Sequence, residues 1–264
     1  MQAQRLAAAR GVIWVLNGFL LYRRGPALLT LLTMFYLLVA IGCGIIEPIG
    51  PFLLPLLLPT LTALVSNACR LLDPSQTVLI TRGALWHGIK TQRGPLLHLG
   101  ALQLAGTVAV LGIDLLLAGG DWADLGKAEE AGPLHLLRLL LLASPMLLAF
   151  WFAPLLTAWD AVPPAKSLFF SLIAALRNWR AFLAYGGTVL VIAAALPALL
   201  MAGASLISSG AVLMLSALLR MLMILIFAPV LMASVYLSYR DIFKATPQAA
   251  AALTPTQEAG SEHG

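Results

Sequence analysis

The sequence predicts an all-α polytopic membrane protein, with six transmembrane helices arranged as three helical hairpins, each preceded by a cytoplasmic interfacial amphipathic helix. The 264 residues are 61% hydrophobic and only 10% charged, whereas a typical soluble domain is about 25% charged. Long apolar stretches recur along the chain, and about 20 such residues suffice to cross a hydrocarbon layer about 30 Å thick. The basic residues lie between these stretches rather than along them.

Six apolar segments are candidate spans. The second contains Pro55 and Pro59, which a membrane helix tolerates where neighbouring groups satisfy the freed backbone. The expected limits are residues 27–46, 52–72, 96–118, 134–159, 181–206 and 211–237.

Lysine and arginine indicate the orientation. Thirteen of the sixteen lysines and arginines precede the first span, lie at the end of the second or after it, separate the fourth from the fifth, or follow the sixth. The other connections contain EPIG, SLISSG and the acidic GGDWADLGKAEEAG, where Lys127 is the one basic residue. By the positive-inside rule, both termini are cytoplasmic. Five or seven spans would scatter these charges over both faces, so the even number is favoured.

Three further segments are interpreted as interfacial amphipathic helices on the cytoplasmic surface. In two of them an acidic residue and proline, Asp73-Pro74 and Asp160 with Pro163, indicate a helix start. Trp14 in the first segment suits the headgroup level. The three segments are residues 3–22, 75–90 and 164–178.

The chain thereby divides into three similar units. Their basic boundaries read RRGP, QRGP and RNWRAF, and their second helices contain LPLLLPTLTALV, FAPLLTAWDAV and FAPVLMASVYL. Units that all begin on the same side are parallel repeats, related by an axis along the membrane normal. The alternative is that leucine-rich helices resemble one another by composition. Residues 1–244 form one membrane domain, and residues 245–264 read as a disordered cytoplasmic tail.

No phosphate-binding loop, zinc-binding HExxH, GxSxG or CxxC motif is present. Cys43 and Cys69 are interpreted as packing residues. The sequence therefore predicts no cofactor, metal site or catalytic residue. The net charge of +5 flanks the spans, which points to anionic lipid headgroups and not to nucleic acid.

Charged residues inside or at the edge of spans are candidate functional residues, because burying charge in a bilayer is costly. Asp114 paired with Arg220 or Arg138 would form a structural clamp or part of a polar cavity, and the clamp is favoured because Arg138 and Glu47 can snorkel. The intramembrane candidates are Arg220, Asp114, Arg138 and Glu47. The interfacial lipid-facing candidates are Arg23, Arg24, Arg93, Arg177, Trp179 and Arg180.

The stretch WFAPLLTAWDAVPPAKSLFFSLIAALRNWRAFLAYGG, residues 151–187, and the opening GFLLYRRGPALL carry a resemblance. They resemble a family of uncharacterised six-helix inner-membrane proteins of Gram-negative bacteria. The hairpin layout is distantly similar to YciC-like proteins and to the membrane domain of glycerophosphodiester phosphodiesterases. The chain has no soluble catalytic domain, so the phosphodiesterase activity is not carried over. The resemblance implies an inner-membrane location and this topology.

Three functions are compatible with these observations. The first is a non-enzymatic scaffold, accessory or regulatory partner of other membrane components, binding anionic lipid and a membrane protein or a second copy. The second is a transporter of small molecules or lipids, with a polar cavity between hairpins containing Arg220 and Asp114. An intramembrane enzyme is disfavoured, because no nucleophile–base or metal set appears.

Overall fold

The computed structural model describes residues 4–46, 48–76, 83–117 and 133–244, and all regular structure in these ranges is helical. Six helical stretches there are long and apolar enough to cross a membrane, with mean hydropathy from 1.7 to 2.5. This confirms the predicted number of spans. They are α2 (Pro26–Ile45), α3 (Gly50–Leu72), α4 (Arg93–Leu117), α5 (Pro133–Asp160), the α7–η4–α8 stretch (Trp179–Leu190, Val191–Ala195, Leu196–Ser205) and the α9–η5–α10 stretch (Ser209–Leu222, Met223–Phe227, Ala228–Phe243).

Consecutive spans lie side by side: α2 packs on α3, α4 on α5, and α8 on α9. α3 also packs along α4, which links the first two pairs. A glycine permits this close approach, since a Cβ added at Gly100 would lie 2.6 Å from the Cα of Leu56. The first four spans therefore form one continuous packed group.

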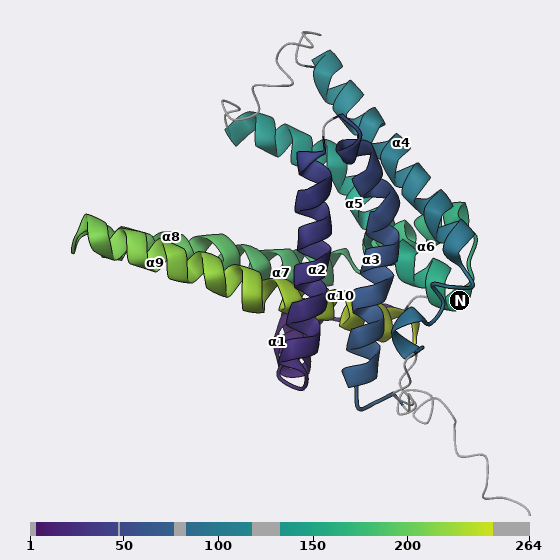
Figure 1. Ribbon diagram of the computed structural model, residues 1–264, viewed down its shortest axis with the longest axis horizontal. Coiled ribbons are helices and arrows are strands. Elements are labelled where there is room, and N and C mark those ends of the chain that lie inside the picture. Colours follow the sequence, from purple (N-terminus) through teal and green to yellow (C-terminus); the bar gives the residue numbers. More distant parts are fainter. Residues whose placement is uncertain (1–3, 47, 77–82, 118–132, 245–264) are drawn as a thin grey trace, which may run out of the picture.

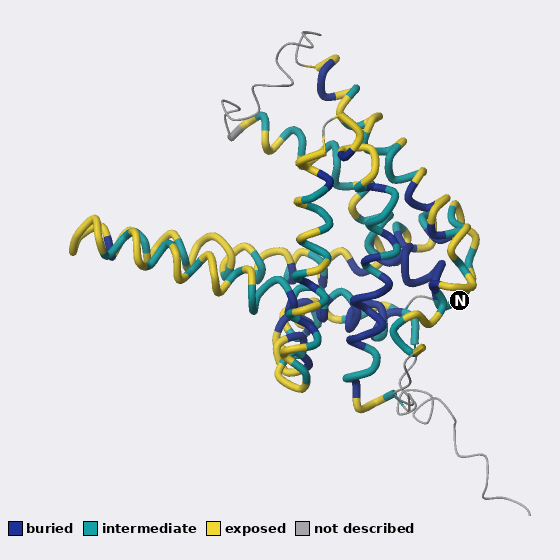
Figure 2. Tube along the Cα trace, viewed as in Figure 1, coloured by how far each residue is buried: buried dark blue, intermediate teal, exposed yellow. Residues whose placement is uncertain are grey.

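The last two spans pass from the packed group into a projecting hairpin, called here the arm (residues 191–227). Figure 1 shows the arm extending away from the other spans, across the direction of α2 and α3. Figure 2 shows most of it exposed or half-buried. Among the described elements, α8 and α9 pack mainly on each other and on the turns that continue them. The arm thus presents apolar surface that the described residues of this chain leave uncovered.

Prolines explain the two π-helical turns at the base of the arm. η4 lies just before Pro197 and η5 just before Pro229. A proline clashes with the carbonyl four residues earlier and cannot donate to it, and a π turn widens the helix there. The carbonyl that Pro229 frees, on Leu225, accepts hydrogen bonds from the hydroxyls of Thr30 at 3.2 Å and Tyr22 at 3.4 Å. Neighbouring elements therefore satisfy the backbone that the proline disrupts.

The N-terminal helix α1 (Arg10–Tyr22) is inserted between α7 and α10. Added Cβ atoms at Gly11 and Gly18 would lie 2.0 Å from the Ala181 carbonyl oxygen and 2.8 Å from that of Val230. The interfacial helix expected over residues 3–22 is shorter than predicted, because residues 4–7 are not helical. Trp14 is 1% exposed, so its assignment to the headgroup level is wrong. Trp14, Val15 and Leu21 of α1 pack on protein, whereas its other large apolar side chains, Val12, Leu16, Phe19 and Leu20, are exposed.

The helix α6 (Pro164–Arg177) packs along α5 through small polar residues. The Ser171 hydroxyl donates to the Leu148 carbonyl at 2.8 Å and accepts from the Phe152 amide at 2.9 Å. It thus bridges two groups that a regular helix would pair directly. Pro154 lies two residues further along α5, and the inserted hydroxyl accommodates the local distortion.

The segment expected to form a helix over residues 75–90 does not form an α-helix in its described part, residues 75–76 and 83–90. Only Ala84–Trp86 is helical there, as the 3-10 turn η1. Gly88 has φ of 74°, and a Cβ on it would lie 2.0 Å from the Ala158 carbonyl oxygen. The Asn67 amide donates to the carbonyls of Leu85 at 2.8 Å and His87 at 3.0 Å. These side-chain bonds replace the backbone bonds that an α-helix would need.

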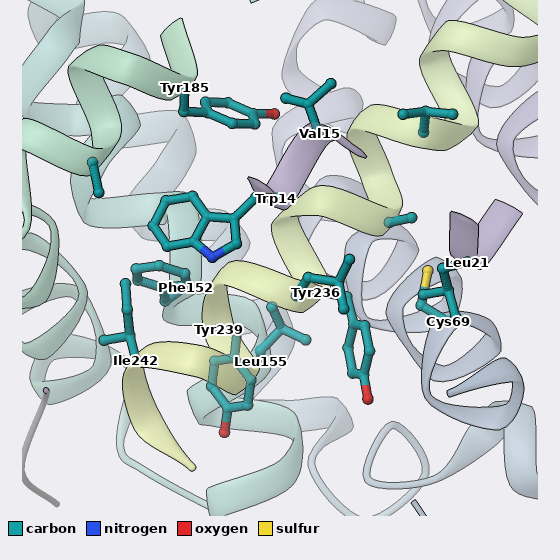
Figure 3. Close-up of a cluster of buried hydrophobic side chains, with 14 of the residues drawn as sticks. Trp14, Val15, Leu21, Cys69, Phe152, Leu155, Tyr185, Tyr236, Tyr239 and Ile242 are labelled. Carbon is teal, nitrogen blue, oxygen red and sulfur yellow. The ribbon is translucent and has the colours of Figure 1, made fainter. Parts of the chain in front are cut away.

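The main core joins α1, α3, α5, α7 and α10 (Figure 3). Trp14 and Phe152 each pack edge-on against Phe182, with ring centroids 5.8 Å and 5.9 Å apart. Both cysteines are free and buried, and Cys69 lies within this core. Glu47, the acidic loop within residues 118–132 and the expected tail 245–264 lie outside the described residues.

Candidate functional site

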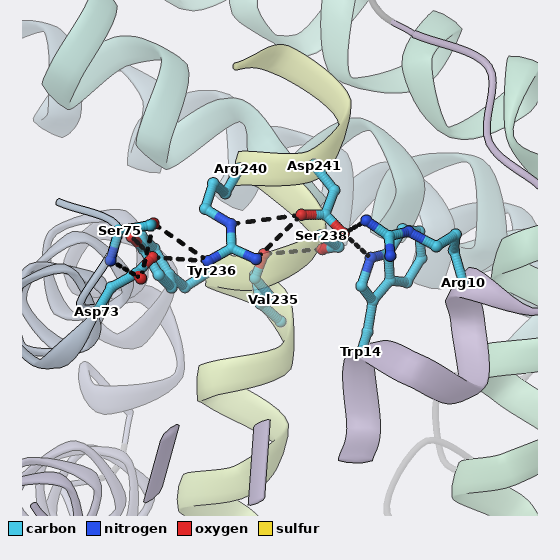
Figure 4. A network of polar contacts seen from close by, with 9 residues as sticks. All are labelled: Arg10, Trp14, Asp73, Ser75, Val235, Tyr236, Ser238, Arg240 and Asp241. Atoms are coloured by element: carbon cyan, nitrogen blue, oxygen red, sulfur yellow. Dashed lines mark hydrogen bonds and ion pairs between the residues drawn. The ribbon is translucent and has the colours of Figure 1, made fainter. Parts of the chain in front are cut away.

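A buried ion-pair network, called here the hub, lies where α1 and the end of α3 meet α10. It consists of Arg10, Asp73, Tyr236, Arg240 and Asp241. Figure 4 shows the Arg240 guanidinium between the two carboxylates. Arg240 Nη1 donates to Asp73 Oδ2 at 2.9 Å, and Nη2 donates to Asp241 Oδ1 at 3.2 Å.

The local sequence Asp73-Pro74-Ser75 prepares the first carboxylate. The Ser75 amide and hydroxyl both donate to Asp73 Oδ1, at 2.9 Å and 2.8 Å, in the turn that aspartate commonly forms with its own backbone. The Tyr236 hydroxyl donates to Oδ2 at 2.7 Å. Burial raises the pKa of Asp73, but the bonds from Tyr236, Ser75 and Arg240 outweigh it and hold the pKa below its ordinary value.

The second carboxylate ties α1 to α10. Asp241 Oδ2 accepts from Arg10 Nη2 at 2.9 Å and from the Trp14 indole at 3.1 Å. Asp73 and Asp241 are 3% and 9% exposed. Buried carboxylates are tolerated only when they are paired and hydrogen-bonded, so the hub holds its three segments together.

A third carboxylate, Asp160 at the end of α5, accepts a hydrogen bond from Tyr239 of α10. Beside it, the Trp159 ring lies between two cations: Arg70 Cζ and Lys244 Nζ are each 5.6 Å from its centroid. Burial and the Arg70 charge lower the pKa of Lys244. The ends of α3 and α5 therefore each contact α10 through one carboxylate, Asp73 and Asp160.

The hub shows no arrangement suited to acid–base or metal chemistry. Each of its carboxylates is engaged by two or more donors. No group of three metal-binding side chains occurs among the described residues. This geometry can fix the relative positions of helices.

The structure brings together two of the predicted intramembrane residues. Arg138 Nε donates to Asp114 Oδ1 at 2.8 Å, joining α5 to α4. His135, which the sequence analysis did not select, contacts Asp114 Oδ2 at 2.9 Å, one helical turn before Arg138. Asp114 is 4% exposed. The cluster therefore joins the end of α4 to the start of α5.

Arg220 lies elsewhere, on α9 within the arm, and its side chain is exposed. It forms no ion pair in the part of the chain that the structure describes. Asp114 and Arg220 are therefore not paired, and Glu47 lies outside the described residues.

The predicted interfacial residues Arg23, Arg24 and Arg93 are exposed, each at or beside the start of a span. Arg177, Trp179 and Arg180 are exposed as well and lie together between α6 and α7, where they line one groove with Arg5. The Arg180 guanidinium stacks on the Trp179 ring, 5.4 Å from its centroid.

Sequence reasoning missed the hub. Asp73 and Asp160 were read only as helix-start signals, and Asp241 was not considered. A signal was present: each of the three second helices ends close to an aspartate, in CRLLDP, TAWDAV and SYRDIF. That recurrence at the ends of repeated helices could have indicated a common meeting point.

One comparison with known proteins finds a relative. The chain is 35% identical over 202 residues to a protein of Burkholderia thailandensis described as a "probable inner membrane protein", covering 70% of this chain and 74% of that one. No family model and no solved structure matches the chain.

Proposed function

The chain belongs to the family of this Burkholderia thailandensis inner-membrane protein, and on that premise we propose that it is a non-enzymatic accessory or scaffold of other inner-membrane components. It is an integral membrane protein with six apolar helices. We place the hub and both termini on the cytoplasmic side, because the segments flanking the spans there carry most of the basic residues. The three-hairpin repeat and its distant likeness to YciC-like proteins belong to the same proposal.

The observation that carries this proposal is Arg220 on the uncovered arm. It lies eleven residues after Ser209, the first residue of α9, within an apolar helical stretch long enough to cross a membrane. A central arginine costs about 2.5–3.5 kcal/mol on insertion scales. An acidic residue of a partner would offset that cost, and the apolar faces of α8 and α9 would supply contact area.

The partner that fits best is a different membrane protein with an acidic residue inside the bilayer. The described carboxylates of this chain already have hydrogen-bond donors. They are Asp73, Asp114, Asp160 and Asp241. A second copy would therefore offer Arg220 no free carboxylate from the described residues.

The test is copurification from native membranes in mild detergent, comparing Arg220→Leu with Arg93→Leu. Both variants remove one exposed arginine, but Arg93 lies at the start of α4, outside the arm. We expect Arg220→Leu to lose a stoichiometric partner with an unchanged melting temperature, and Arg93→Leu to retain it. Retention of the partner by Arg220→Leu would overturn the proposal. Loss of a solute flux in that variant would favour the transporter hypothesis instead.

A further inference from the structure

Two grooves meet beside the start of α7, one cationic and one apolar. The cationic groove, about 570 Å³, is lined by Arg5, Arg177 and Arg180 together with Leu176 and Trp179. The apolar groove, about 500 Å³, runs between α5, α6 and α7 and shares Leu176 and Trp179 with the first. Both volumes fall within the range of about 300–1,000 Å³ typical of small-molecule sites.

The cationic groove has no acidic counterpart among the described residues. Its three arginines are exposed and form no ion pair there. The described carboxylates are engaged elsewhere, in the hub, by Tyr239, or by Arg138. Three guanidinium groups without a partner attract a multiply hydrogen-bonding anion such as a phosphate.

The position of Arg5 is set by a buried residue. Asn178, 2% exposed, accepts from the Leu6 amide at 2.8 Å and donates to the Gln4 carbonyl at 2.9 Å. The Gln4 amide in turn donates to the Ile242 carbonyl at 3.0 Å. The N-terminal segment, which is not helical at residues 4–7, is thereby held across the start of α7. Arg5 lines the groove with Arg177 and Arg180 without needing to be ordered by a ligand.

The neighbouring groove is suited to a hydrocarbon chain. Its walls include Leu147, Trp151, Phe182 and Leu183, and its floor includes Gly186. An added Cβ at Gly186 meets no atom within 4 Å, so the absence of a side chain leaves this end of the groove open. A free phosphate ion would leave this surface unused.

We propose that the two grooves together bind one anionic glycerophospholipid, with its phosphate among Arg5, Arg177 and Arg180 and an acyl chain along Trp151, Phe182 and Gly186. The site rests on the proposed function in one respect, namely that this end of the protein faces an anionic membrane leaflet. Trp179 and Leu176 form the boundary where headgroup and chain meet, which is the level that amphipathic rings prefer.

The test is the amount of lipid retained by the full-length protein after purification, measured by mass spectrometry, and the shift in melting temperature on adding lipid. We expect retained anionic phospholipid, and a melting temperature raised by phosphatidylglycerol in mixed detergent micelles but not by phosphatidylcholine in the same micelles or by inorganic phosphate. Arg177→Gln/Arg180→Gln should bind phosphatidylglycerol at least roughly tenfold more weakly. The control Lys90→Gln/Lys166→Gln removes two exposed basic residues outside both grooves, and this variant should bind normally.

A second pair of variants tests the acyl chain separately. Gly186→Phe fills the apolar groove, whereas Gly187→Phe places the same side chain into open space outside it. We expect only Gly186→Phe to lose phosphatidylglycerol. Equal binding by both variants, stabilisation by inorganic phosphate alone, or no retained anionic lipid would overturn the proposal. Partner copurification through Arg220 is a separate readout, so the two proposals can fail independently.

Discussion

The hub and the arm share one helical stretch, Ser209–Phe243, but differ in what surrounds it. The last stretch, Ser209–Phe243, begins in the arm, where none of its most apolar window is buried. It ends in the hub, where Tyr236, Tyr239 and Ile242 are almost fully buried. In α3, by contrast, 56% of the corresponding window is buried. The comparison teaches that hydropathy marks a span without indicating whether lipid or protein surrounds it.

The chemistry of the two regions differs accordingly. In the hub, each charge has a partner within hydrogen-bond distance, so the network stabilises one arrangement of α1, α3 and α10. In the arm, Arg220 forms no ion pair with any residue that the structure describes. We therefore expect substitutions in the hub to affect stability and, under the proposed function, substitutions in the arm to affect association.

The largest expected effect comes from Asp241→Ala. It removes the acceptor of Arg10 and Trp14 and one acceptor of Arg240. We expect a loss of about 3 kcal/mol, at the lower end for breaking a buried pair because Arg10 can turn toward solvent. Unfolding in detergent, followed by tryptophan fluorescence, measures it. Arg220→Ala in the arm is the control, and equal stability of the two variants would contradict the comparison.

Matched glycine substitutions sharpen the contrast between the regions. Gly11→Ala forces a Cβ against the Ala181 carbonyl, whereas Gly203→Ala in α8 meets no atom within 4 Å. We expect Gly11→Ala to destabilise the protein by about 1–3 kcal/mol. Gly203→Ala should stabilise it by up to about 1 kcal/mol through helix propensity. Melting temperatures that move in the same direction would show that α1 is not docked as described.

Acid should weaken the hub through Asp73. Its folded-state pKa lies below the ordinary value, which is about 3.9 in an unfolded chain. The stabilisation is therefore fully present above about pH 4 and is lost as the pH falls through the folded pKa. Melting temperatures measured from pH 7 to pH 3 should fall less steeply in Asp73→Asn than in the wild type. Identical pH profiles would show that Asp73 does not contribute to the loss of stability in acid.

The smallest expected effect is at the base of the arm. Thr30→Val removes one of the two hydroxyls that donate to the Leu225 carbonyl freed by Pro229. We expect a loss of about 1 kcal/mol, because the Tyr22 hydroxyl remains. Tyr22→Phe/Thr30→Val should cost more than either single change. Thr188→Val is the control, since its hydroxyl bonds only within its own helix.

Several features could be predicted from consecutive residues. The six spans depend on about 20 adjacent apolar residues each. The end of the first surface segment at Tyr22 and the start of the third at Pro164 likewise follow from local glycine and proline signals. The prediction of a helix over residues 75–90 is wrong for residues 83–90, because contacts with Asn67 and Ala158, distant in sequence, hold these residues in another conformation.

The sequence by itself determined that this protein resides in a membrane and crosses it with six helices, because hydropathy is a local property. The tertiary structure alone decided which charges meet. An amphipathic α1 has the same pattern whether it rests on lipid or on protein, and only the docked structure places Trp14 on Asp241, 227 residues away. It likewise placed Asp114 with Arg138 and left Arg220, on the arm, without an ion pair among the residues that the structure describes. Such pairings depend on the packing of every helix between the partners.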